Sequence, residues 1–329
     1  MESHASKPAA PARPSPLLIA AVAAVAVAAI PTATLLAQDG KAPFTVTETK
    51  RGYPTLQAAV DAIGGGTGTI AIAPGTYREC AVQSGGNITY LASDPGKAVF
   101  SGKTCQGKAA LVLGGQSARV AGLVFRDMAV PDFNGAGIRL ENGNLTVAQS
   151  WFLDSQQGIL TGNDPNGMIV IDKTTFSGLG NCEDQSGCAH SLYVGEYGHL
   201  RVTRTRFERG TGGHYLKSRA KVVEIASSDF DDSAGRATNY MIDLPNGATG
   251  QITNNWFVQG RDKENYSAFI AVGAENRSNP STGLTIAGND ARFAPSLRRS
   301  SAFVADWTGA ALKLGPNTLG DGIKPFEKR

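Results

Sequence analysis

The sequence predicts an all-β fold in which short coils of strand and turn stack along one axis. A six-residue phrase, Val/Ile/Leu-x-x-Ser/Thr/Asn-x-Phe/Leu, recurs through much of the chain. Its spacing varies, from 23 residues between Val202 and Ile225 to 34 residues between Ile252 and Ile286, so a unit repeats with insertions. A unit this short cannot bury its own apolar face and is stable only when stacked on copies of itself. The phrase begins at Val147, Ile171, Val202, Ile225, Ile252, Ile286 and Leu314, after an incomplete copy at Val120.

The units are predicted to consist of strands rather than helices because their apolar residues alternate. An apolar residue stands two positions before each phrase, as in Leu145-x-Val147, and period two is typical of β-structure. The polar fourth slot is expected at a turn, where Ser, Thr and Asn side chains stack from coil to coil and bond to free backbone groups. The sixth slot is expected to form an internal stack of phenylalanines. A second alternating strand precedes each phrase: GIRL at 137, GILT at 158, SLYV at 191, YLKS at 215, MIDL at 241 and FIAV at 269.

The first 37 residues have the features of a secretory signal peptide. Lys7 and Arg13 precede an apolar run from Leu17 to Ile30, and small residues up to Ala37 offer a cleavage point. An uncleaved N-terminal membrane anchor is the alternative. In both cases the remaining chain lies outside the cytoplasm, so the protein is expected to be secreted or periplasmic.

The segment YPTLQAAVDAIGGGTGTIAIAPGTYRE, which begins at Tyr53, opens the repeat region. With the repeats that follow, it resembles a right-handed parallel β-helix of the pectin-lyase-like superfamily. The resemblance implies one domain over residues 53–329, a linker over 38–52 and a short helix, Leu56 to Ile63, that caps the first coil. Covering this end is also physically required, because an open solenoid end exposes a sheet edge. The superfamily contains polysaccharide lyases, glycoside hydrolases, uronate epimerases, esterases and non-catalytic surface proteins, so the fold does not determine the chemistry.

Four cysteines support export. Cys80 and Cys105 lie in adjacent early segments, and Cys182 and Cys188 bracket one loop, so two disulfides are predicted, with buried free thiols as the alternative. The C-x5-C spacing without a companion pair argues against zinc. A net charge of +3 over 329 residues gives no indication of nucleic acid or of a membrane surface as a partner.

Two insertions predict where a binding cleft lies. Residues 177–189 lengthen the repeat before the SLYV strand, and residues 273–283 lengthen it after the FIAV strand. Insertions in solenoids form loops that often wall a binding site. Both are expected to overhang the outer face of the same parallel sheet.

Alternation predicts which side chains line that cleft. Because Ile138, Ile159, Leu192, Leu216, Ile242 and Ile270 point inward, the residue after each one points outward. Tyr193, Lys217 and Asp243 thus become neighbours in an outward column, with Arg219 beside Lys217. An ordinary surface ion pair is the alternative interpretation. The column consists of Arg139, Leu160, Tyr193, Lys217, Asp243 and Ala271.

This cluster suits proton abstraction next to a carboxylate. Removal of the C5 proton of a uronic acid builds negative charge on its carboxylate, which Arg219 is expected to neutralise. Lys217 is the predicted base and Tyr193 the predicted acid for the leaving oxygen. These roles resemble those of the polysaccharide lyases in the superfamily.

Further residues are predicted to contact the substrate. The segment from His199 to Lys221 is strongly basic, which indicates an anionic ligand. A solvated charged face is the alternative, if Arg204 and Arg206 lie on a different side of the solenoid from Lys217. His190 and His214 occupy equivalent places in consecutive coils and are expected to stack at a turn. Histidines with a purely structural role are the favoured interpretation of this pair, and His214 is otherwise the alternative base. The predicted substrate-binding residues are Asp243, Arg139, Glu196, His190 and Arg201.

Lyase-type β-elimination on an acidic, uronate-containing polysaccharide is therefore the favoured function. The alternative is a non-catalytic carbohydrate-binding or surface-polysaccharide assembly module with the same cleft. A uronate C5-epimerase and a glycoside hydrolase are further alternatives, although Asp243 lacks the outward acidic neighbour that a hydrolase needs. No metal or other cofactor is expected, calcium being left open without a motif, and the protein is expected to be a monomer.

Overall fold

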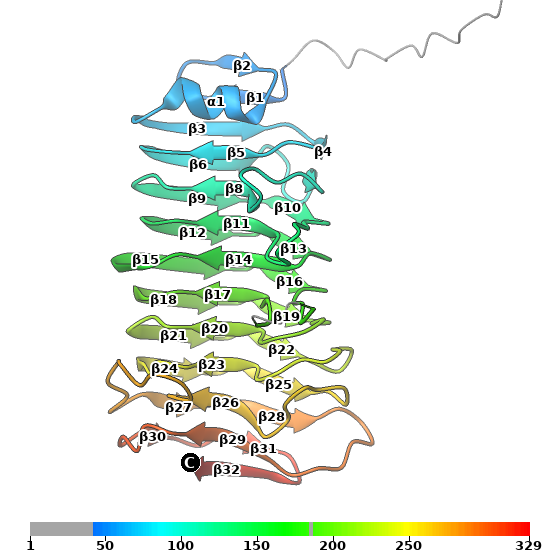
Figure 1. Ribbon diagram of the computed structural model, residues 1–329, viewed down its shortest axis with the longest axis vertical. Helices are drawn as coiled ribbons and strands as arrows, with labels where there is room; N and C mark the ends of the chain where they lie inside the picture. Colours follow the sequence, from blue (N-terminus) through cyan, green and yellow to red (C-terminus); the bar gives the residue numbers. More distant parts are fainter. Residues whose placement is uncertain (1–41, 184–186) are drawn as a thin grey trace, which may run out of the picture. The chain divides into compact units, whose positions relative to one another are not determined.

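Three sheets run along the stack of coils, and successive coils contribute successive strands to each sheet (Figure 1). The computed structural model describes residues 42–183 and 187–329, which contain 32 strands and one α-helix. Strands pair in parallel with their neighbours except where β1 takes part. The predicted all-β solenoid is confirmed, while its right-handed coiling stays a prediction. The predicted signal peptide, residues 1–37, lies outside the described residues.

Sheet A, with 12 strands, contains the first half of each phrase. Its inward residues, such as Val147 and Ile171, are fully buried and lie in register. The sheet starts earlier than predicted, because β1 pairs antiparallel with β2 and β3, so residues 44–53 belong to the fold and not to a linker. These three-residue strands are too short to show alternation. The strands are β1 Phe44–Val46, β2 Arg51–Tyr53, β3 Thr67–Ile72, β6 Asn87–Ala92, β9 Ser117–Ala121, β12 Asn144–Ala148, β15 Asp164–Asp172, β18 Tyr197–Thr203, β21 Val222–Ala226, β24 Thr249–Thr253, β27 Thr285–Ala287 and β30 Lys313–Leu314.

Sheet B, with ten strands, carries the predicted phenylalanine stack. Phe176, Phe207 and Phe230 are fully buried, with 4.8 Å between the ring centroids of each neighbouring pair. Parallel strands in register set this spacing, because the strand separation is about 4.8 Å. The strands are β4 Gly75–Tyr77, β7 Ala98–Ser101, β10 Leu123–Arg126, β13 Trp151–Leu153, β16 Thr175–Ser177, β19 Arg206–Glu208, β22 Asp229–Asp231, β25 Trp256–Gln259, β28 Asp290–Phe293 and β31 Thr318–Leu319.

Sheet C, also with ten strands, contains the alternating strands that precede each phrase. Ile159, Leu192 and Leu216 are fully buried in the core and pair in register. Each residue that follows them therefore lies on the outer face. The strands are β5 Ala81–Gln83, β8 Ala109–Leu113, β11 Ala136–Leu140, β14 Gln157–Thr161, β17 Leu192–Val194, β20 Leu216–Ser218, β23 Ile242–Leu244, β26 Ala268–Val272, β29 Ser301–Asp306 and β32 Ile323–Lys328.

The turn between sheets A and B holds the buried polar slot of the phrase. In the last coils an asparagine ladder links one coil to the next: the backbone N–H of Ser228 donates to Asn255 Oδ1, and that of Asn255 donates to Asn289 Oδ1, each at 3.0 Å. These side chains satisfy backbone groups that the turn withdraws from the sheets. The residue before the slot adopts φ between 48° and 70°, in Gln149, Lys173, Arg204, Ser227, Asn254 and Gly288.

The helix α1 spans Leu56–Ile63, the predicted range. Thr55 begins it, because its hydroxyl accepts a hydrogen bond from the backbone N–H of Ala58 at 3.2 Å. Leu56, Ala59 and Val60 are buried, and the helix contacts β1, β2, β3 and β5. Its function as a cap stays a prediction.

Both predicted disulfides are present, Cys80–Cys105 and Cys182–Cys188. Cysteines paired in this way are typical of proteins that fold outside the reducing cytoplasm. Within residues 42–183 and 187–329, no helix has the length and apolar character needed to cross a membrane.

Candidate functional site

The outward column of sheet C has the predicted register. Tyr193 pairs with Leu160 on one side and Lys217 on the other, and Lys217 pairs with Asp243. The three side chains thus project from consecutive coils on the same face. Asp243 differs from expectation in being only 3% exposed, because Lys217 and His214 cover its carboxylate.

Lys217 and Arg219 together hold one carboxylate. Lys217 Nζ donates to Glu275 Oε1 at 2.7 Å, and Arg219 Nη2 donates to Glu275 Oε2 at 2.5 Å. Arg219 also donates through Nε to the Tyr193 hydroxyl at 3.0 Å and through Nη1 to Asn246 Oδ1 at 2.5 Å. We call this pair, Lys217 and Arg219, the cation pair. Four hydrogen bonds to Glu275, Tyr193 and Asn246 fix the position of the guanidinium and the ammonium group.

A buried histidine pair lies beside the cation pair. The rings of His190 and His214 have centroids 4.9 Å apart, and Tyr240 continues the stack at 5.6 Å from His214. The backbone N–H of His214 donates to His190 Nδ1 at 3.0 Å. His190 Nδ1 is therefore the acceptor of a neutral ring whose proton lies on Nε2.

Burial changes the ionisation of three groups here. It lowers the pKa of His190 well below its usual value, and it lowers the pKa of His214 to about 3, with further lowering by Lys217. It raises the pKa of Asp243 to about 6 despite the opposing charge of Lys217. At neutral pH both imidazoles are thus neutral and Asp243 is ionised.

The carboxylate of Asp243 connects the histidines to the cation pair. Its Oδ2 lies 3.4 Å from His214 Nε2 and 3.5 Å from Lys217 Nζ. His214 Nδ1 and Asp243 Oδ1 are buried, and neither has a hydrogen-bond partner among the described residues. Unpartnered buried polar atoms are costly and concentrate at functional sites.

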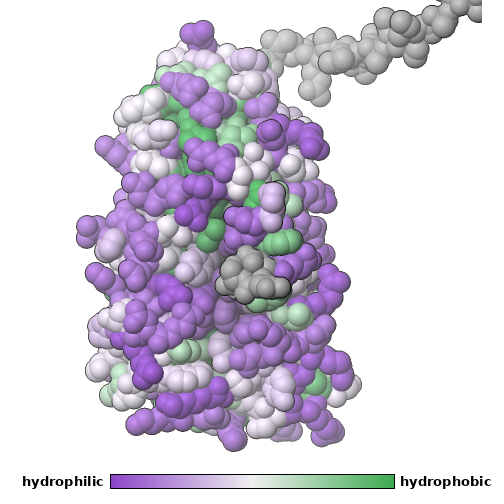
Figure 2. All heavy atoms as spheres, viewed as in Figure 1, coloured by the Kyte–Doolittle hydropathy of each residue, from purple (hydrophilic) through white to green (hydrophobic). Residues whose placement is uncertain are grey.

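A cavity of about 450 Å³, here called the histidine cavity, is lined by both histidines, Tyr193 and the cation pair. Its walls come from sheet C and from the disulfide loop that starts after β16. In the view of Figure 2, hydrophobic residues gather toward the N-terminal coils and hydrophilic residues dominate the rest of this side. The lining residues are Asn134, Gln157, Leu160, Gly187, Cys188, His190, Tyr193, Gly213, His214, Lys217, Arg219, Asn239 and Glu264.

Three predicted substrate-binding residues lie at or beyond the edge of this cavity. Glu196 reaches the cluster through Asn246, whose Nδ2 lies 3.5 Å from Glu196 Oε1. Arg139 stands in the same column, but Leu160 separates it from Tyr193, and its guanidinium donates to Glu141. Arg201 does not belong to the cluster, because β18 places it in sheet A next to Glu224.

The basic segment before Lys217 also spreads around the coil. Arg204 binds Asp172 next to sheet A, Arg206 binds Glu208 in sheet B, and Arg209 binds Asp154. A three-sided coil distributes consecutive residues over different faces, so local charge in the sequence does not create one basic surface. Lys217 and Arg219 are the cations of this segment that lie together at the candidate site.

Glu275 and Asn246 are contacts of the cation pair that strand alternation did not predict. Both approach from loops, Glu275 from the insertion after β26, and strand alternation gives no prediction for loop side chains. The signal that pointed to Glu275 was the insertion itself, which overhangs this face as expected.

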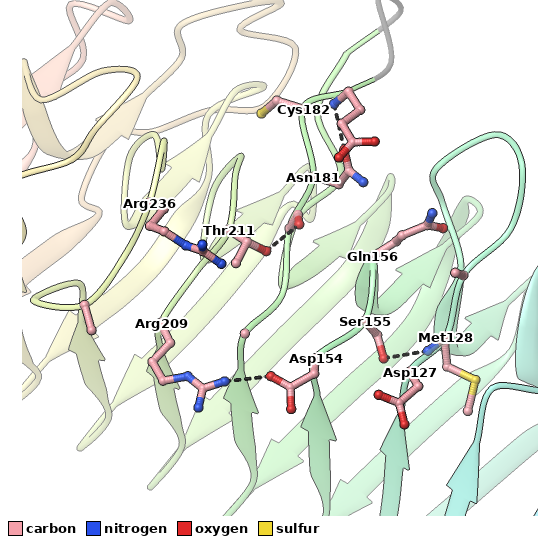
Figure 3. A pocket seen from close by; sticks show the side chains of 15 residues that line it. Asp127, Met128, Asp154, Ser155, Gln156, Asn181, Cys182, Arg209, Thr211 and Arg236 are labelled. Atoms are coloured by element: carbon pink, nitrogen blue, oxygen red, sulfur yellow. Dashed lines mark hydrogen bonds and ion pairs between the residues drawn. The ribbon is translucent and has the colours of Figure 1, made fainter.

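A second cavity of about 830 Å³ lies where the strands of sheet B end. Two of its charged groups pair with each other: Arg209 points toward Asp154 and donates to it at 2.6 Å (Figure 3). Both side chains are about half exposed. Because the histidine cavity is lined by two buried histidines whose pKa values are lowered, we place the candidate site there.

Among the described residues, one group of potential metal ligands lies at the wall of the histidine cavity, which Cys188 and Glu264 help to line. Sulfur and oxygen atoms of Cys182, Cys188 and Glu264 lie within 4.8 Å of one another. Both sulfurs are used by the disulfide, so they are not available as thiolate ligands.

No family model matches the chain, and no curated protein matches it. Among solved structures, ORF18 of Geobacillus virus E2 is similar at 14% identity and a TM-score of 0.45, over 82% of this chain and 55% of that one. The chain thus spans about half the length of the viral protein. The catalytic unit of a thermostable GH87 α-1,3-glucanase from Streptomyces thermodiastaticus is similar at 12% identity and a TM-score of 0.32, over 87% of this chain and 68% of that one. Likenesses this distant carry no inference about binding or activity.

Proposed function

We propose that this is an exported protein of the pectin-lyase-like type that acts on an acidic, uronate-containing polysaccharide in the histidine cavity, by β-elimination. One observation carries the proposal: the cation pair already holds a carboxylate, that of Glu275, with one oxygen on each cation. The same geometry fits the carboxylate of a uronic acid, whose negative charge grows when the C5 proton is removed.

The neighbouring groups supply the proton transfers. The Tyr193 oxygen accepts from Arg219 Nε, so its own hydroxyl proton is free for the leaving oxygen. Lys217 is the nearest amine, but its ammonium donates to Glu275 and lies beside Asp243, so it must lose a proton before it acts as base. His214 is already neutral and is the second base, although a ring with so low a pKa is a weak one.

The ion pairs of Lys217 also favour a second function, non-catalytic binding of the same polysaccharide. A lysine held by two carboxylates is a stable cation site. In that case the cation pair recognises the uronate, and no bond is broken.

Absorbance measurements on uronate polymers separate these functions. We expect a rise in ultraviolet absorbance from an unsaturated product. The rate of this rise should fall about a hundredfold in Arg219→Ala and in Lys217→Ala. Arg201→Ala is the matched control, because it removes the same charge from sheet A. Binding that needs Arg219 without any absorbance change supports the binding module. If no acidic polymer in the panel binds, the proposal is wrong.

A further inference from the structure

Glu275 occupies the place that the proposed function assigns to the ligand. Its carboxylate engages both members of the cation pair, and 44% of its side chain is exposed, so the group is accessible from solvent. Lys217 and Arg219 are only 12% and 21% exposed. Of these three charged groups, Glu275 is therefore the most exposed to solvent.

Hydrogen bonds hold the backbone at Glu275, whereas its side chain is held only by the contacts of its carboxylate with the cation pair. The backbone N–H groups of Glu275 and Asn276 donate to Pro245 O at 3.0 and 3.1 Å. Asn279 Nδ2 donates to Arg219 O and to Gly247 O, each at 3.1 Å. Displacement of the carboxylate requires only a rotation of the side chain, with the loop remaining in place.

We infer that Glu275 is a resident competitor that determines specificity: only a ligand with a carboxylate positioned for both Lys217 and Arg219 displaces it. This inference rests on the proposed function and adds its selection step. A neutral sugar has no group that compensates the lost ion pairs, and it is rejected. Without Glu275 the two cations have a free oxygen-binding site and accept uronates more readily.

The charge state of Glu275 supports this competition. Burial acts to raise the pKa of Glu275, but hydrogen bonds from Lys217 and Arg219 outweigh it and hold the pKa below its usual value. The competitor is thus ionised throughout the neutral range, and acidification to mildly acidic pH does not release it.

Substitution of Glu275 by glutamine tests the inference. We use glucuronate and short oligogalacturonates as probes, with binding followed by nuclear magnetic resonance titration. We expect Glu275→Gln to bind uronates about tenfold more tightly than the unmodified protein. Glu264→Gln is the matched control, because it removes one negative charge from the cavity wall without touching the cation pair.

The outcomes separate this inference from the proposed function. Tighter binding in Glu275→Gln that disappears when Arg219→Ala is added supports both. Binding that depends on Arg219 but is equal or weaker in Glu275→Gln overturns the competitor role and leaves the proposed function intact. If Glu264→Gln gains as much affinity as Glu275→Gln, the effect is one of general charge and the competitor role is wrong. If no uronate binds either protein, the proposed function itself fails, and the competitor role fails with it.

Discussion

Asp243 and His214 are neighbouring ionisable groups whose pKa values move in opposite directions from their usual values. Burial favours the neutral form of each, which is the acid for Asp243 and the base for His214. Their contributions to pH-dependent stability therefore have opposite signs. Asp243 destabilises the fold as the pH rises through about 6, and His214 destabilises it as the pH falls below its unfolded pKa of about 6.5.

This opposition predicts the effect of Asp243→Asn. With a pKa of about 6 against 3.8 for the free side chain, ionisation of Asp243 costs the fold roughly 3 kcal/mol as an upper limit. Asparagine removes that loss and leaves the rise with pH that His214 causes. Stability from urea unfolding should thus increase more steeply between about pH 4 and pH 6 in the variant. The exposed Asp321→Asn should follow the unmodified protein, and a slope no steeper in Asp243→Asn would contradict the expectation.

For a single side chain, the sequence predicts the face of the strand on which it lies better than it predicts how deeply it is buried. Alternation placed Tyr193, Lys217 and Asp243 on one face because a strand has only two faces. It could not predict the burial of Asp243, since one of the two groups that cover its carboxylate, His214, precedes strand β20 and lies outside the alternating pattern. Arg201 was misplaced because a coil with three sheets has three outer faces, and period two does not say which one a strand occupies.

At the scale of elements, the phenylalanine stack and the asparagine ladder are the repeated contacts of the fold. The stack was predicted, because a residue type that recurs at one slot of a repeat must meet its own copies in neighbouring coils. For the polar slot, the prediction was a turn where Ser, Thr and Asn side chains bond to free backbone groups, and the ladder is the asparagine case of it. The sequence did not show that the second half of each phrase forms a strand of its own, in sheet B. Strands of three residues, such as β13 and β16, are too short to be distinguished from the turns beside them.

Phe207→Ala tests the contribution of the stack. Its ring lies between those of Phe176 and Phe230 and is fully buried, so its loss creates a cavity that the parallel strands cannot close. We expect a loss of about 3–5 kcal/mol of unfolding free energy, measured by denaturant titration. Phe326→Ala makes the same chemical change at a ring that is 38% exposed. Equal losses in the two variants would show that the stack is not a major source of stability.

The whole described stack is stabilised by contacts between neighbouring coils, so its two ends have fewer partners than its middle. The sheet A and sheet B strands at the C-terminal end, β30 and β31, contain two residues each. The candidate site lies well away from that end, on β17, β20 and β23. Its position suits a cluster that requires fixed distances between side chains of different coils.

Hydrogen exchange tests this gradient in stability. Backbone amides of β17, β20 and β23 should exchange more slowly than those of β30 and β31, because end coils open without disrupting the others. Mass spectrometry of peptides along the chain measures the difference. Equal protection from end to end would show instead that the stack opens as one cooperative unit.

The equivalence of the coils limits how such a molecule changes in length. Since phenylalanines in the middle of the stack, such as Phe176, Phe207 and Phe230, meet a phenylalanine on both sides, duplication or deletion of one of these coils leaves that stack continuous. The histidine cavity lacks this tolerance, because Tyr193, Lys217 and Asp243 come from three adjacent coils. A coil gained between any two of them would separate their side chains by a further strand spacing of about 4.8 Å. Growth of the scaffold is therefore compatible with the chemistry only outside that three-coil segment.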